Sequence, residues 1–221
     1  MERNVYSLVL APDVVAQVDK LAYEKNTSRS NLINQILAEY FSFPTPETRM
    51  KSIFDSVEQI MAELESFQVQ FQPSDAMISI RSALRYRYNP TIRYVLELYR
   101  NCDPAVGQLR VSARTQSGSL IQVLTEFFRF WAKLEVRLIG SYFPEGMRFF
   151  QIENGKFTRE FLMPATEEMQ ENEEIANAIG DYIQLFDASL KQYFANLDDP
   201  ETASAVAEQN YKSHLKQHDI I

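Results

Sequence analysis

The sequence predicts an α+β chain in two parts: a short N-terminal strand followed by two helices, and then an α+β domain in which helices cover an antiparallel sheet. Two observations predict this division. Residues 4–41 begin with an alternating apolar run and continue with two helical periodicities, whereas residues 77–114 alternate as strands. Because a lone strand of about seven residues cannot pair or bury its apolar side, the first part predicts an intertwined dimer.

The two N-terminal helices have recognisable ends. Pro12 and Asp13 begin the first, because proline suits an early helical position and a carboxylate suits the positive end of the helix dipole. Asn26 can adopt the left-handed conformation that ends a helix, and Thr27 or Ser28 can cap the next. The apolar positions are Val14, Val15, Val18, Leu21 and Ala22 in the first helix, and Leu32, Ile33, Ile36, Leu37 and Tyr40 in the second. Their spacing places each set on one helical face.

Three short stretches carry a family resemblance: residues 18–22 (VDKLA), 27–30 (TSRS) and 31–33 (NLI). In their order and spacing, residues 1–45 resemble the ribbon-helix-helix family of bacterial DNA-binding proteins, the Arc, MetJ and CopG type. The resemblance implies that strands from two chains pair antiparallel and enter the major groove of double-stranded DNA. It therefore implies a homodimer formed through the N-terminal strand and helices.

The resemblance also implies which residues face the DNA. If Tyr6, Leu8 and Leu10 face the helices, the strand period of two turns the alternate residues toward base edges. Those residues are Val5, Ser7 and Val9, with Arg3 able to reach a phosphate or base from the N-terminal arm. Family members usually carry long polar side chains there, whereas here only Ser7 is polar.

The start of the second helix is the other expected DNA contact. Free backbone N–H groups and hydroxyls at a helix N-terminus bind phosphate oxygens. The residues concerned are Thr27, Ser28, Arg29 and Ser30. The alternative is that Ser28 only caps the helix and Arg29 is a solvated surface residue.

Charge is distributed unevenly along the chain. The 221 residues have a net charge of −8, which opposes nonspecific coating of nucleic acid, so any DNA contact must be local. Residues 1–50 carry five basic and six acidic side chains, whereas residues 77–114 carry seven arginines and two acidic residues. A single cysteine, Cys102, and the absence of a signal-peptide pattern or a long apolar run predict a cytoplasmic protein with no membrane association.

The rest of the chain divides into a linker and connecting helix (46–66), an α+β domain (67–197) and a polar tail (198–221). Strands at 77–88 and 91–100 form a hairpin about Asn89-Pro90, and a third strand spans 108–114. A broad amphipathic helix then runs to about residue 139. A second hairpin spans 147–163 with Asn154-Gly155 at its turn, and a helix with an acidic lead follows.

The strands place arginines on one face of the predicted sheet. The set is Arg81, Arg85, Arg87, Arg93, Arg110 and Arg114. Three interpretations stay open: a solvated face whose arginines are partly paired by acidic residues, a site for a phosphate-bearing effector, or an added nucleic-acid surface. In the third, the stacking side chains would come from Tyr86, Tyr88, Tyr94 and Tyr99.

Signatures of catalysis or of a cofactor are missing. The chain has no glycine-rich phosphate loop, nucleophile elbow or cysteine–histidine pairing at a recognisable spacing. His214 and His218 form at most half of a metal site, without further ligands, so we expect neither a metal nor a cofactor. The predicted function is a dimeric, sequence-specific transcriptional regulator of repressor type, with a C-terminal domain for a small-molecule effector or for assembly. The alternative is a protein-interaction module of antitoxin type, which uses the N-terminal unit mainly to dimerise and binds a protein partner.

Overall fold

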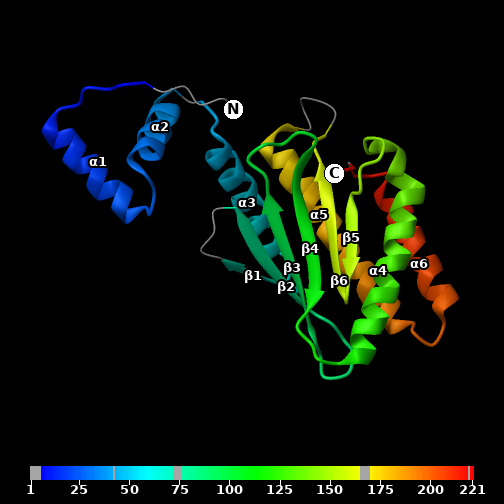
Figure 1. The fold of residues 1–221 in the computed structure, drawn as a ribbon. Coiled ribbons are helices and arrows are strands. Elements are labelled where there is room, and N and C mark those ends of the chain that lie inside the picture. Colours follow the sequence, from blue (N-terminus) through cyan, green and yellow to red (C-terminus); the bar gives the residue numbers. More distant parts are fainter. Residues whose placement is uncertain (1–5, 42, 72–75, 165–169, 219) are drawn as a thin grey trace. The chain divides into compact units, whose positions relative to one another are not determined.

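The computed structural model describes residues 6–41, 43–71, 76–164, 170–218 and 220–221. It divides the chain into two compact units, residues 1–49 and 50–221. The described residues contain six α-helices and six strands, and all strands belong to the second unit (Figure 1).

The N-terminal unit contains two helices, α1 (Pro12–Glu24) and α2 (Arg29–Tyr40). Pro12 occupies the first turn of α1, as predicted. The backbone of Asn26 is left-handed (φ 49°), which turns the chain out of α1, and the Ser28 hydroxyl caps α2 by accepting a hydrogen bond from the Asn31 amide at 3.2 Å. The two helices and the turn between them are therefore confirmed.

The predicted N-terminal strand is wrong. Residues 6–10 form no strand, and the strands of the described chain start at Phe67, after three helices. The physical reason is that a strand needs a hydrogen-bonded neighbour, and no described strand pairs with residues 6–10. The start of the chain, including Arg3 and Val5, lies outside the described residues.

The second unit is an antiparallel sheet in the order β1-β2-β3-β4-β6-β5. Its strands are β1 (Phe67–Phe71), β2 (Met77–Ala83), β3 (Thr91–Leu98), β4 (Ala105–Ala113), β5 (Phe150–Glu153) and β6 (Lys156–Leu162). The strand predicted over 77–88 ends at Ala83. Residues 84–90 form a turn in which Tyr88 (φ 66°) and Asn89 (φ 44°) are left-handed. The Asn154-Gly155 turn joins β5 and β6, as predicted.

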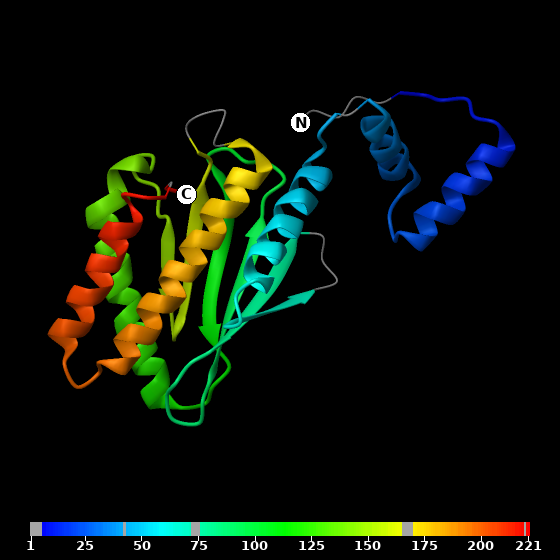
Figure 2. The ribbon, with the colours of Figure 1, turned by 180° about the vertical axis from the view of Figure 1, so that it is seen from behind.

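Helices form a layer on one side of this sheet. They are α3 (Pro46–Ala62), α4 (Gly118–Ile139), α5 (Asn172–Ala195) and α6 (Pro200–His214), with a short 3-10 turn η1 (Gly140–Tyr142) after α4. Figure 2 shows α3 and α5 across the sheet, and α4 continues the layer beside β5. A Cβ atom at Gly180 of α5 would lie 3.0 Å from Cγ2 of Ile60, so glycine permits the close approach of α3 and α5.

An aromatic cluster fills the space between the sheet and the helices. Phe186 of α5 is fully buried and lies at its centre. Its ring centroid is 5.2–6.3 Å from those of Tyr94, Phe127, Phe128, Trp131, Phe157 and Tyr182. Because each aromatic side chain removes a large apolar area from water, this cluster supplies much of the hydrophobic stabilisation of the unit.

A buried ion pair joins α4, β6 and α6. Arg159 Nε donates to Glu135 Oε1 at 3.0 Å, with both side chains almost completely buried, and the Tyr211 hydroxyl donates to the same oxygen at 3.0 Å. The guanidinium lies 4.4 Å from the ring of Tyr182 and donates to the main-chain oxygen of Ile221. Burial lowers the pKa of Arg159, but the charge and hydrogen bond of Glu135, together with Tyr182 and Tyr211, raise it by more, and the net shift is upward. Residues 198–221, predicted as a polar tail, thus contain a helix whose inner side joins the domain core.

Replacing Arg159 by Met should leave the Glu135 carboxylate buried without its cation. We expect the free energy of unfolding to fall by about 3–5 kcal/mol, as when one partner of a buried pair is removed. Urea unfolding measures this change. The double variant Glu135→Leu with Arg159→Met should recover most of this stability, because no buried charge is then unpaired. A double variant as unstable as the single one would contradict this explanation.

The environment of His214 in α6 predicts that acid weakens the domain. Burial, and then the nearby ring of His218, lower the pKa of His214 to about 4, whereas an unfolded histidine titrates near pH ~6.5. Between these pH values the unfolded chain binds more protons, so the free energy of unfolding should fall as the pH falls from about 6.5 to about 4. Urea unfolding at several pH values should show a smaller decrease for His214→Gln. Equal pH dependence in the two proteins would exclude this role.

Candidate functional site

The N-terminal unit leaves most of its large apolar side chains in contact with water. Its described buried apolar residues are Ala22, Leu32 and Ala38. The exposed apolar residues are Tyr6, Leu8, Val9, Leu10, Val14, Tyr23, Ile36, Leu37, Tyr40, Phe41 and Phe43. They include residues on both helices, and Tyr40 is 81% exposed. Such a concentration on one small unit is typical of an interaction surface.

The structure places only part of the predicted base-facing set. Ser7 and Val9 lie in the extended segment before α1, and both side chains are exposed. The other two members, Arg3 and Val5, fall outside the described residues. Ser7 and Val9 are therefore accessible, and their contact with DNA remains a prediction.

The four residues predicted to contact phosphate lie together at the start of α2. Ser28 is the N-cap, Thr27 precedes it, and Arg29 and Ser30 form the first helical turn. Arg29 Nη2 donates to Asp19 Oδ2 of α1 at 2.6 Å, with the arginine side chain 66% exposed. Surface ion pairs of this kind contribute about 0–1 kcal/mol, so Arg29 can exchange this partner for a phosphate at little cost.

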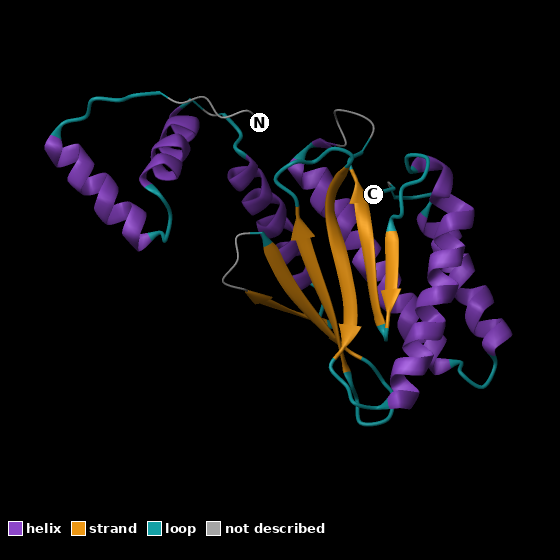
Figure 3. Ribbon diagram, in the orientation of Figure 1, coloured by secondary structure: helices purple, strands orange, loops and turns teal. Residues whose placement is uncertain are grey.

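The predicted arginine face divides into three groups. Arg81, Arg93 and Arg110 lie on the open face of the sheet, the side opposite α3 and α5, which Figure 3 shows in front of the helices. Arg85 and Arg87 are in the turn 84–90. Arg114 follows β4. Arg81 and Arg93 are directly opposite in register, whereas Arg110 pairs with Glu97 at 2.8 Å.

The four predicted stacking tyrosines have different environments. Tyr94 is buried and its hydroxyl donates to Asp187 at 2.8 Å, so its proposed stacking role is wrong. Tyr86 packs against Phe194 of α5, at 5.3 Å between centroids. The Tyr99 hydroxyl donates to the Glu160 carboxylate at 2.9 Å. Tyr88 alone among them is fully open, with 99% of its side chain exposed.

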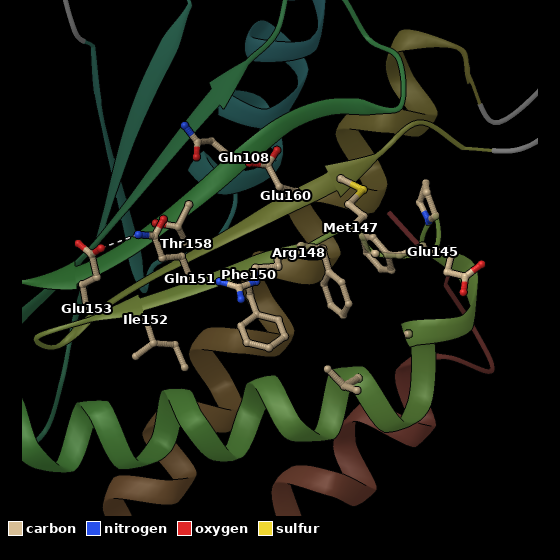
Figure 4. A pocket seen from close by; sticks show the side chains of 16 residues that line it. Gln108, Glu145, Met147, Arg148, Phe150, Gln151, Ile152, Glu153, Thr158 and Glu160 are labelled. Carbon is tan, nitrogen blue, oxygen red and sulfur yellow. Dashed lines mark hydrogen bonds between the residues drawn. The ribbon is translucent and has the colours of Figure 1, made fainter.

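A cleft that the sequence did not predict lies beside β5, with a volume of about 960 Å³. Figure 4 shows Phe150 and Ile152 pointing toward α4, with Gln151, Thr158 and Glu160 on the strands above them. The rings of Phe143 and Phe149 stack at 3.7 Å beside it. The sequence signals that could have indicated this cleft are turn residues, namely Gly146 (φ 78°) and Asn154-Gly155. These turns bring residues 143–153 back along α4.

The cleft is acidic on its sheet side. Glu160 and Glu153 line it, and Glu97 is opposite Gln108, another lining residue. Burial raises the pKa of the Glu160 carboxyl, the Tyr99 hydroxyl lowers it, and Glu97 raises it, with a net upward shift. Arg148 also lines the cleft, so the charged lining combines carboxylates with one guanidinium. Together with the apolar residues, this mixed lining suits a ligand that has both polar groups and an apolar part.

The histidines do not assemble a metal centre in the described chain. The rings of His214 and His218 stack at 4.6 Å, and His218 Nδ1 lies 2.6 Å from an Asp181 carboxylate oxygen. Within the described ranges, no group of three or more His, Cys, Asp or Glu side chains is placed to hold a metal ion. Likewise, no described helix has the length and apolar character needed to cross a membrane.

Comparison with protein-family models, with curated proteins and with solved structures finds no match to this chain.

Proposed function

We propose that this chain is a dimeric DNA-binding regulator. In this proposal, the N-terminal units of two copies pair through their exposed apolar residues. Ser7, Val9 and the start of α2 then face double-stranded DNA. The observation that carries the proposal is the poor burial of a folded two-helix unit that exposes Ile36, Leu37 and Tyr40.

Pairing with a second copy is supported by the energetics of small units. A unit of residues 1–49 is small, and below about 70–80 residues one core supplies little stability, so oligomerisation, a metal or disulfides commonly add to it. The N-terminal unit contains no cysteine, because Cys102 is the chain's only one, and its described part holds no metal cluster. Ile36 and Leu37 are 44% and 46% exposed, so burying the rest of each side chain at an interface would contribute about 1 kcal/mol. A second copy supplies the same apolar residues by symmetry.

DNA binding is supported by the resemblance of residues 1–45 and by the start of α2. Amide groups of the first helical turn, the Ser30 hydroxyl and the exposed Arg29 guanidinium are suitable partners for one phosphate. The net charge of −8 means that affinity must come from this local surface. The cleft beside β5 is the proposed site for a small-molecule effector.

The proposal predicts that Arg29→Ala weakens duplex binding similarly for all sequences. The logarithmic salt dependence should become shallower by about 0.9 for each phosphate that the variant no longer neutralises. Ser7→Ala should change the preference among sequences more than the overall affinity. Lys51→Ala, which removes an exposed cation from α3, is the matched control.

The experiment is to pass the full chain over fragmented DNA from its own source near physiological salt and to sequence the retained fragments. Fluorescence anisotropy on an enriched site then compares the three variants. Recovery of a repeated site that Arg29→Ala no longer retains supports the proposal. No enrichment, or equal affinity in wild type and Arg29→Ala, contradicts it.

A protein-interaction module is the second candidate. It is favoured by the apolar character of Leu8 and Val9, both exposed, and by the acidic balance of residues 1–50. In this case the extended segment would contact another protein rather than bases. A stoichiometric protein partner on the full chain, together with no retained DNA at moderate salt, would favour this function.

A further inference from the structure

One row of side chains across the open face is basic. Successive register partners place Gln68, Arg81, Arg93, Ser112, Lys156 and Glu153 side by side on β1, β2, β3, β4, β6 and β5. Arg81, Arg93 and Lys156 are exposed, whereas their neighbours Ile80, Ile92 and Phe157 point into the core. With strands about 4.8 Å apart, Lys156 lies about 10 Å from Arg93 across the sheet.

Arg81 and Arg93 lie directly opposite each other although their positive charges repel. Like charges directly opposite on neighbouring strands destabilise a sheet. Arg93 Nε donates to Ser79 Oγ at 2.9 Å, which fixes its guanidinium, and neither Arg93 nor Arg81 has an ion pair with a described carboxylate. The remaining donors of both groups are therefore available to an anion.

Apart from Glu153, which lies opposite Lys156, the acidic residues named on this face lie toward its other end. Glu97, Gln108 and Glu160 form a second row, in which Glu97 pairs with Arg110 and Glu160 accepts from Tyr99. Glu97 follows Arg93 by four positions along β3, which is about 13 Å. The face therefore has a basic end and an acidic end.

The turn 84–90 continues the basic end. It follows β2 three residues after Arg81 and leads into β3 three residues before Arg93. Hydrogen bonds from Leu84 N to Pro90 O (2.9 Å) and from Asn89 N to Tyr86 O (2.8 Å) close it. The side chain of Tyr88 is fully exposed, and its backbone is left-handed. A left-handed backbone is unfavourable for a bulky residue and is a frequent sign of a functional constraint.

We propose that the basic end, defined as Arg81, Arg93, Lys156 and the turn 84–90, binds single-stranded nucleic acid. The cations contact the phosphate backbone, and the open ring of Tyr88 stacks on one base. A single strand fits better than a duplex because the bases of a duplex are already stacked on each other. This site lies wholly within residues 50–221 and is separate from the duplex contact proposed above.

The test measures binding of the full chain to fluorescent single-stranded DNA and RNA of one mixed sequence, about 15 nucleotides long, within the site sizes of known single-strand binders. The double variant Arg81→Ala/Arg93→Ala should bind both strands about tenfold more weakly at low salt. Its logarithmic salt dependence should be shallower by about 1.4, because two fewer phosphates are neutralised. Similar weakening for DNA and RNA identifies the backbone as the shared ligand, and weakening for one strand alone identifies that strand as the ligand.

Tyr88 gives an independent test of stacking. Tyr88→Phe should bind like the wild type, and Tyr88→Asn should bind at least about fivefold more weakly. Asparagine tolerates the left-handed conformation, so the thermal midpoint of Tyr88→Asn should not fall. Removing the opposed arginines should not lower the midpoint either. Weaker binding by a properly folded variant therefore shows that the substituted side chain touches the nucleic acid.

A control tests whether any loss of binding is local to this surface. Arg129→Ala removes an exposed arginine from α4 and should bind single strands as the wild type does. Unchanged binding in the Arg81→Ala/Arg93→Ala variant would overturn the proposal. A matched duplex that competes as well as the single strand would overturn it too.

Discussion

One constraint governs the N-terminal unit: two short helices cannot bury their own apolar side chains. A helix pair offers each helix a single neighbour, so the outer parts of both apolar stripes stay in water unless another surface covers them. In α1 and α2, the buried apolar residues are Ala22, Leu32 and Ala38, whereas Leu37 and Tyr40 stay exposed. The dimer that we propose for residues 1–49 is an answer to this imbalance.

The second unit satisfies the same requirement within one chain. Its sheet, its helix layer and the aromatic cluster around Phe186 enclose a continuous core. The ion pair of Glu135 and Arg159 extends that core to α6. A self-sufficient scaffold can hold charged groups in unfavourable positions, as it does for Arg81 opposite Arg93. The second unit can therefore present sites on a rigid sheet, whereas in the N-terminal unit the dimer that we propose would supply the missing burial.

Local signals were predictable from the sequence, and non-local pairings were not. Pro12, Ser28 and Asn154-Gly155 act through their immediate neighbours, and the structure confirms the helix starts and the hairpin turn. The strand expected before Pro12 fails because its pairing partner is not set by local sequence. Arg159 lies in strict alternation between Phe157 and Phe161, a signal that could have placed it in the core. Its partner Glu135 has no such signal, since a glutamate in a helix is usually solvated.

The pairing of two N-terminal units can be measured through the molar mass of the full chain by sedimentation equilibrium, over about two decades of concentration so that a mass-action equilibrium is visible. We expect the mass of two chains for the wild type and a shift toward one chain for Leu37→Glu, because a charge on the exposed apolar surface of α2 opposes its burial. The mass of a single chain at every concentration would contradict the proposed interface. A dimer that persists unchanged in Leu37→Glu would contradict the surface assigned to it.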